Sequence, residues 1–136
     1  MSLAFSTVPR LLLGSGISKT LGSILNANGH KHPLIVTDKH LLSLGLLQPA
    51  LDNLKDMGIN YTLFSGVNPD PKEKDVVDAL TVVGTCSCDS VVGFGGGSSL
   101  DVSKILSYII KLQQTTTHNN TGETPNFNSM YGVANL

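Results

Sequence analysis

Residues 89–104 read DSVVGFGGGSSLDVSK, and this stretch decides the fold. Its first part, residues 91–94, has the β-branched and aromatic side chains of a buried strand. Residues 100–109 carry apolar side chains at helical spacing, after serines that can cap a helix. The glycines between the two parts leave backbone N–H groups open at the positive end of that helix. The stretch therefore predicts a strand, a turn that can hold a phosphate, and a helix.

The glycine turn has a second interpretation, because glycines between a strand and a helix can also serve only a tight chain reversal. The grouping of Gly93, Gly95, Gly96 and Gly97 directly before Ser98 favours a phosphate or pyrophosphate ligand. Two familiar loops are excluded. The Gly-Lys-Ser/Thr triplet of nucleotide triphosphatases does not occur, and serine stands where the common dinucleotide fingerprint has its third glycine.

Size and composition describe one domain with a real core. The chain has 136 residues, of which 40% are hydrophobic and 14% charged. A net charge of −1 without a basic stripe argues against nucleic acid as a partner. The sequence has no apolar run long enough to span a bilayer, so we expect a cytoplasmic protein. We expect Cys86 and Cys88 to be reduced thiols, because no further metal ligands lie at suitable spacing.

Strand and helix patterns alternate along the chain. The strands are fully apolar rather than alternating, which predicts an α/β fold whose parallel sheet has helices on both faces. The expected strands are residues 10–13, 34–37, 61–64 and 91–94, and the expected helices are residues 17–28, 40–45, 51–57, 72–84 and the one that begins after the glycine turn.

Ligands of parallel sheets bind beyond the carboxyl ends of the strands, which places Asp38 near the glycine turn. A carboxylate there can accept hydrogen bonds from an adenosine ribose and repels a 2′-phosphate, which favours NAD over NADP. Asp38 can equally cap the helix that begins at Lys39. Asp101 lies at the positive end of the motif helix and can contact a ligand or pair with Lys104.

Three segments together resemble the iron-dependent (group III) alcohol dehydrogenases. They are LGSG at 13–16, LIVTDK at 34–39, and FSGVNPDP at 64–71 followed by GGGSSLDVSK at 95–104. The resemblance implies a Rossmann-like, dehydroquinate synthase-like N-terminal domain that binds NAD, with NADP less favoured. It places Asp38 at the ribose, with Asp70 and Asp101 as weaker contacts. It places the pyrophosphate at Gly95, Gly96, Gly97 and Ser98.

The resemblance also implies a division of the chain. Residues 1–112 are the expected dinucleotide-binding domain, and 113–136 the expected flexible polar loop with a truncated segment. The family holds its metal on one aspartate and three histidines of a helical domain, which has no counterpart in this sequence. We therefore assign no catalytic residue and no metal ligand, and expect Fe2+ or Zn2+ only in a full-length parent. The isolated chain is expected to show little or no dehydrogenase activity.

Two alternatives to an alcohol dehydrogenase remain open at this point. One is a relative within the wider superfamily, either a glycerol or polyol dehydrogenase or a protein similar to dehydroquinate synthase. The other is a non-catalytic module for nucleotide binding or dimerisation. The expected partners are accordingly a nicotinamide dinucleotide and, under the last alternative, a second copy of the chain.

Overall fold

The computed structural model of the chain describes residues 10–85 and 87–119. At its centre is a parallel sheet of three strands in the order β2-β1-β3. The strands are β1 (Pro33–Val36), β2 (Thr62–Phe64) and β3 (Ser90–Gly93). In the middle of β1, Ile35 is level with Leu63 of β2 and Val92 of β3.

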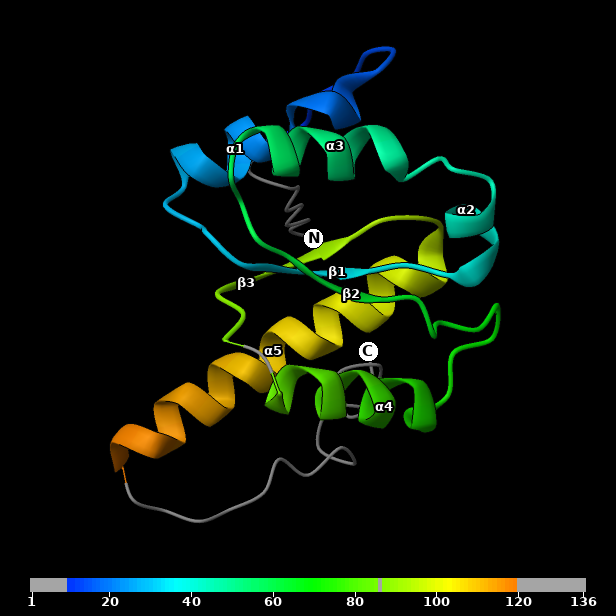
Figure 1. Cartoon of the computed structure of the whole chain (residues 1–136). Helices are drawn as coiled ribbons and strands as arrows, with labels where there is room; N and C mark the ends of the chain where they lie inside the picture. Colours follow the sequence, from blue (N-terminus) through cyan, green and yellow to red (C-terminus); the bar gives the residue numbers. More distant parts are fainter. Residues whose placement is uncertain (1–9, 86, 120–136) are drawn as a thin grey trace, which may run out of the picture.

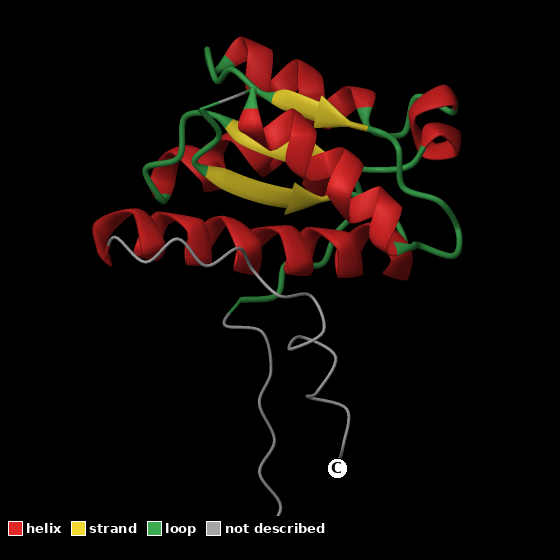
Figure 2. Ribbon diagram, turned by 90° about the horizontal axis from the view of Figure 1, so that it is seen from below, coloured by secondary structure: helices red, strands yellow, loops and turns green. Residues whose placement is uncertain are grey.

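Helices cover both faces of this sheet, as Figures 1 and 2 show. The helices α1 and α3 lie on one face, and α4 and α5 on the other. This arrangement confirms the predicted α/β fold with a parallel sheet between two helical layers. The helical elements are the 3₁₀ helix η1 (Ile17–Thr20), α1 (Leu21–Ala27), α2 (Lys39–Ser43), α3 (Gln48–Asp56), α4 (Glu73–Gly84) and α5 (Gly97–Asn119).

Strand β1 separates two halves of the core. Leu34 and Val36 pack on the side of α4 and α5, whereas Ile35 packs on the side of α1 and α3. All three side chains are completely buried. Burial of such a side chain contributes about 1.5–3 kcal/mol, so a central strand that is apolar on both faces anchors both layers at once.

The predicted strand at residues 10–13 is not formed. These residues have no strand conformation, and Leu11 and Leu13 are 70% and 84% exposed. A strand needs a neighbour to complete its hydrogen bonds, and an apolar run does not specify one. Among the described residues the sheet therefore begins with β1.

Two further expectations differ from the structure. Helix α5 continues to Asn119, through residues 113–119, where we expected a polar loop. Once a helix is nucleated, each added residue gains a hydrogen bond, so polar Gln and Thr residues can extend it. Residues 120–136 of the expected loop lie outside the described part, and the domain boundary stays a prediction. Cys88 is disulfide-bonded rather than a reduced thiol.

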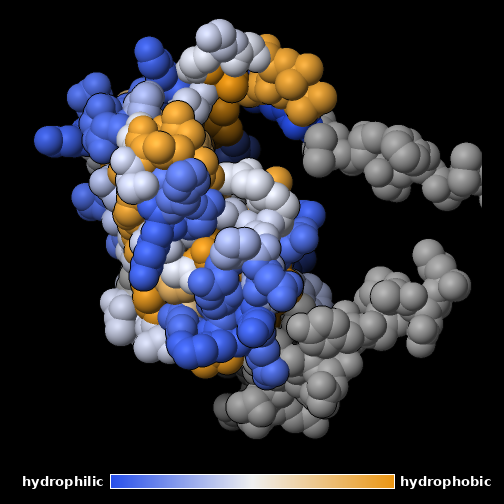
Figure 3. Space-filling model, turned by 90° about the vertical axis from the view of Figure 1, so that its right-hand side faces the viewer, coloured by the Kyte–Doolittle hydropathy of each residue, from blue (hydrophilic) through white to orange (hydrophobic). Residues whose placement is uncertain are grey.

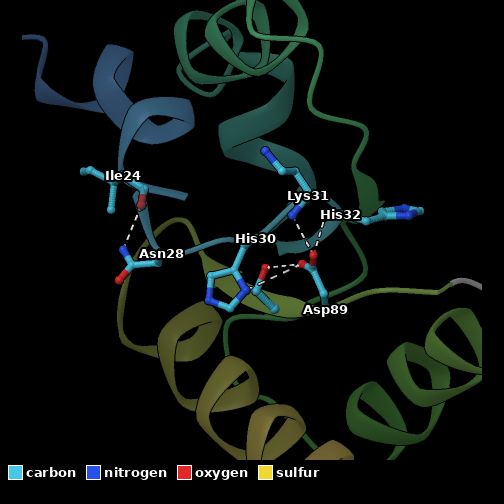
Figure 4. A network of polar contacts seen from close by, with 7 residues as sticks. Ile24, Asn28, His30, Lys31, His32 and Asp89 are labelled. Atoms are coloured by element: carbon cyan, nitrogen blue, oxygen red, sulfur yellow. Dashed lines mark hydrogen bonds and ion pairs between the residues drawn. The ribbon is translucent and has the colours of Figure 1, made fainter. Parts of the chain in front are cut away.

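At the amino ends of β1 and β3, one carboxylate joins the two strands (Figure 4). Asp89 Oδ2 accepts hydrogen bonds from the backbone N–H groups of Lys31 (2.6 Å) and His32 (3.1 Å). Its Oδ1 accepts from the Ser90 hydroxyl and lies 3.8 Å from His30 Nδ1. Burial acts to raise the pKa of Asp89, but these hydrogen bonds and the His30 charge outweigh it and hold the pKa below its ordinary value.

Within the described residues, no helix is both long enough and apolar enough to cross a lipid bilayer.

Candidate functional site

A cleft of about 830 Å3 lies at the carboxyl ends of the strands. Figure 3 shows the molecule from this side, with hydrophilic residues over the lower part of the face. Three loops that are far apart in the sequence meet there, because parallel strands end at one edge of their sheet. The lining residues are Asp38, Lys39 and His40 after β1; 65–69 after β2; Lys74, Asp75 and Asp78 of α4; and 96–99 after β3.

The glycines at the end of β3 and in the turn that follows it fall into two pairs. A Cβ added to Gly93 would lie 2.7 Å from Ser103 Oγ, and one added to Gly95 would lie 2.8 Å from Leu41 Cδ1. Gly95 also has φ of +143°, which side chains rarely adopt. A Cβ at Gly96 or Gly97 would meet no atom within 4 Å. Packing therefore requires Gly93 and Gly95, whereas Gly96 and Gly97 leave an open cradle.

The open pair stands at the start of α5. Gly97 is the first residue of the helix, and Leu100 N donates to Gly96 O to close its first turn. The first N–H groups of a helix have no partner within it and carry partial positive charge. Because Gly96, Gly97 and Ser98 line the cleft, an anion such as a pyrophosphate can approach this end without meeting a Cβ of the two glycines.

Ser98 lies in the cleft, and its hydroxyl already has a protein partner. Ser98 Oγ donates to the Pro69 carbonyl at 2.9 Å, which ties the glycine turn to the loop after β2. A hydroxyl has one hydrogen to donate. While this bond is formed, Ser98 can offer a ligand its backbone N–H but not its hydroxyl hydrogen.

Asp38 caps a helix, as one of its two interpretations expects, and it also lines the cleft. Its Oδ1 accepts from Leu41 N at 2.8 Å and so caps α2. Its Oδ2 has no protein partner within the described part of the chain and can accept a ribose hydroxyl. Beside it, the buried Oγ1 of Thr37 lacks a hydrogen-bond partner among the described residues. Such an orphaned hydroxyl is uncommon in a protein interior.

Three residues expected at the site do not line the cleft. Gly95 lies behind the open pair, against Leu41 and Ser99. Asp70 is exposed in the loop after β2. Asp101 points to solvent, where its Oδ1 pairs with Lys104 Nζ at 3.0 Å.

Several cleft residues were not foreseen. Lys39 and His40 directly follow β1, so the rule on strand ends could have found them. Lys74 pairs with Asp78, and its hydrogen bond to that carboxylate, with their mutual charge, raises the Lys74 pKa above its ordinary value. Asn68 and Asp75 meet through a loop-to-helix contact that no spacing rule predicts.

The described residues offer no place for the metal that the resemblance implies. No group of three or more His, Cys, Asp or Glu side chains comes together among them. Metal ions in proteins need several such ligands at once. No step of a reaction is therefore assigned to a metal on this chain.

The fold is a Rossmann-like α/β domain with a cleft at the carboxyl ends of its strands. The model of the family "Iron-containing alcohol dehydrogenase" matches residues 9–130. The chain therefore belongs to this family.

Individual relatives match over the same region. The chain is 34% identical over 105 residues to an NAD-dependent methanol dehydrogenase of Bacillus methanolicus, which covers 77% of the chain and 28% of the relative. A solved NADH-dependent butanol dehydrogenase of Thermotoga maritima superposes with a TM-score of 0.71 at 26% identity, over 77% of the chain and 27% of that protein.

A third match is a sulfoacetaldehyde reductase of Bifidobacterium kashiwanohense, solved in complex with NAD+. It has a TM-score of 0.61 at 31% identity, over 67% of the chain and 24% of that protein. The chain thus spans about a quarter of the length of these relatives.

Proposed function

We propose that the cleft binds NAD and that the chain is the nucleotide-binding part of an alcohol dehydrogenase. The backbone N–H groups of Gly96, Gly97 and Ser98 hold the pyrophosphate, and Asp38 Oδ2 accepts from the adenosine ribose. One observation carries this proposal above all. Of the four glycines at 93–97, the two that packing does not require, Gly96 and Gly97, are the two that line the cleft containing Asp38.

The relatives support the nicotinamide cofactor. One is named NAD-dependent, another NADH-dependent, and a third was solved with NAD+. Asp38 supports NAD over NADP, because its charge would repel a 2′-phosphate placed at the same ribose. The contribution of this chain is to bind the dinucleotide and orient it. Hydride transfer between an alcohol and the nicotinamide ring is the reaction that we propose for an alcohol dehydrogenase with this domain as its nucleotide-binding part.

Isothermal titration with NAD and NADP tests the site on the wild type and Gly96→Val. We expect the substitution to weaken NAD binding at least ten-fold, because the side chain fills the cradle. Gly84→Val is the matched control: Gly84 is equally open but lies at the far end of α4, and NAD affinity should not change. Unchanged binding by Gly96→Val would refute the cradle. Absence of binding by the folded wild type would refute the NAD site.

A second consequence concerns activity. We expect the purified 136-residue chain to form no NADH from an alcohol, even with added Fe2+ or Zn2+, because the described residues do not assemble a metal site. The rate of absorbance change at 340 nm measures this (the NADH band). Metal-dependent turnover would show that the chain itself carries the chemistry.

Location and assembly stay predictions. We infer a cytoplasmic location, because the sequence has no apolar run long enough to span a bilayer. A homodimer would involve the exposed apolar residues at 11–13 and in the link between α2 and α3. Light scattering on the purified chain distinguishes a dimer from a monomer.

A further inference from the structure

The loop after β2 forms one wall of the cleft and is held at its base. Gly66 makes a backbone bridge to Asp38, and Val67 is 4% exposed within the core on the side of α4 and α5. Beyond Val67 the chain must leave the core. The next two residues, Asn68 and Pro69, still line the cleft, so contacts outside the core must hold them in place.

Two hydrogen bonds hold this outer part. Asn68 Nδ2 donates to Asp75 Oδ1 at 2.7 Å, and the carbonyl of the next residue, Pro69, accepts from Ser98 Oγ at 2.9 Å. The first bond anchors the loop to α4 and the second anchors it to the glycine turn. The loop after β2 is thus fixed both to α4 and to the glycine turn.

Asp75 is an unusual residue to find at this place. It is 3% exposed, although burial of a carboxylate is costly unless donors surround it. Capping of α4 uses only Oδ2, which accepts from Lys72 N at 3.1 Å. The neighbouring cation, Lys74, has Asp78 as its ion-pair partner. The second buried oxygen, Oδ1, is committed to Asn68.

We propose that Asp75 is a positioning residue for dinucleotide binding. Through Asn68 it fixes the loop after β2, so that Pro69 meets Ser98 and the open glycine pair faces a cleft of the right width. This inference rests on the proposed function, and it assigns no direct contact between Asp75 and the ligand.

Two variants separate positioning from contact and from charge. Asn68→Leu removes the donor without a change in charge. The double variant Asn68→Asp/Asp75→Asn exchanges donor and acceptor at the same net charge. In the double variant the amide of position 75 can donate to the new carboxylate, while its carbonyl oxygen accepts from Lys72 N. Asn60→Leu is the matched control, because Asn60 is exposed at the opposite end of the sheet.

Isothermal titration with NAD gives the first readout. We expect Asn68→Leu to raise the Kd for NAD about ten-fold, because a hydrogen bond to a charged group is lost. The Kd of the double variant should lie within about three-fold of the wild-type value. Asn60→Leu should bind as wild type does. Circular dichroism confirms that each variant is folded. Full affinity of Asn68→Leu overturns the proposal. Weak binding by the double variant also overturns it, since Asn68 would then contact the ligand itself.

Hydrogen exchange of residues 65–68 gives a second readout, which needs no ligand. We expect exchange about ten-fold faster in Asn68→Leu and restored in the double variant. If the folded wild type binds no NAD, the proposed function fails and with it the role of Asp75 in binding, while exchange still decides whether Asp75 fixes the loop after β2. Faster exchange in Asn68→Leu and wild-type exchange in the double variant then support the role of the Asn68–Asp75 hydrogen bond in holding the loop. Equal exchange in all variants overturns this role.

Discussion

The two ends of the sheet differ in whether their polar groups find hydrogen-bond partners within the described part of the protein. At the amino ends of the strands, Asp89 gathers two backbone N–H groups and a hydroxyl, so the donors that surround it are satisfied within the protein. At the carboxyl ends, the first N–H groups of α5 face a cleft, and Thr37 Oγ1 lacks a partner in the described part. The difference separates an end whose polar groups join the strands from an end whose polar groups stay available to a ligand.

The largest expected effect lies at the amino end. Asp89→Ala should lower the free energy of unfolding by about 2 kcal/mol, because two backbone N–H groups lose a charged acceptor. Chemical denaturation followed by circular dichroism measures this. NAD affinity of the folded fraction should stay within two-fold of wild type, because Asp89 lies at the opposite end from the cleft. A large loss of NAD affinity at unchanged stability would show that Asp89 acts on the cleft, contrary to the separate roles of the two ends.

Asp38→Asn should produce a smaller effect, confined to the carboxyl end. Asparagine caps helices as well as aspartate does, so stability should change by less than about 0.5 kcal/mol. Loss of the negative charge should reduce the preference for NAD over NADP about ten-fold, or about 1.4 kcal/mol. Competitive titration of the two dinucleotides measures the ratio. Asp38→Ala is the contrasting variant, since it also loses the cap and should cost about 1 kcal/mol of stability.

The contribution of the amino end to stability should also depend on pH, through the carboxylate of Asp89. The folded-state pKa of Asp89 lies below its ordinary value of 3.8, so its contribution to stability is present above that pH. The contribution is lost as the pH falls through the folded-state pKa. Thermal unfolding between pH 6 and pH 2.5 should show a steeper loss below pH 4 in the wild type than in Asp89→Ala. Parallel curves would mean that the ion-pair and hydrogen-bond network adds nothing.

Local patterns predicted most of this architecture because they act through neighbouring residues. Short runs of apolar residues predicted β1, β2 and β3, and the glycines at 95–97 predicted the turn before α5, because such patterns depend only on residues that are close in the sequence. The run at residues 11–13 is also apolar, yet membership of a sheet also needs a partner strand.

The site was predicted in part for the same reason. The rule on strand ends places Asp38 near the glycine turn from the sequence alone. The bond from Ser98 to Pro69 spans 29 residues, and the contact between Asn68 and Asp75 depends on how a loop meets a helix. Such side-chain pairs follow from the assembled fold, and composition or spacing carries no sign of them.

The smallest expected effects concern the two acidic residues that the resemblance placed near the ligand and that the cleft excludes. Asp101→Asn removes an exposed ion pair with Lys104, and such pairs contribute about 0–1 kcal/mol. Asp70→Asn changes an exposed loop residue. We expect each to alter NAD affinity by less than two-fold in titration. A ten-fold loss in Asp101→Asn would mean that this carboxylate turns from Lys104 to the ligand, and that the carboxyl end rearranges when it binds.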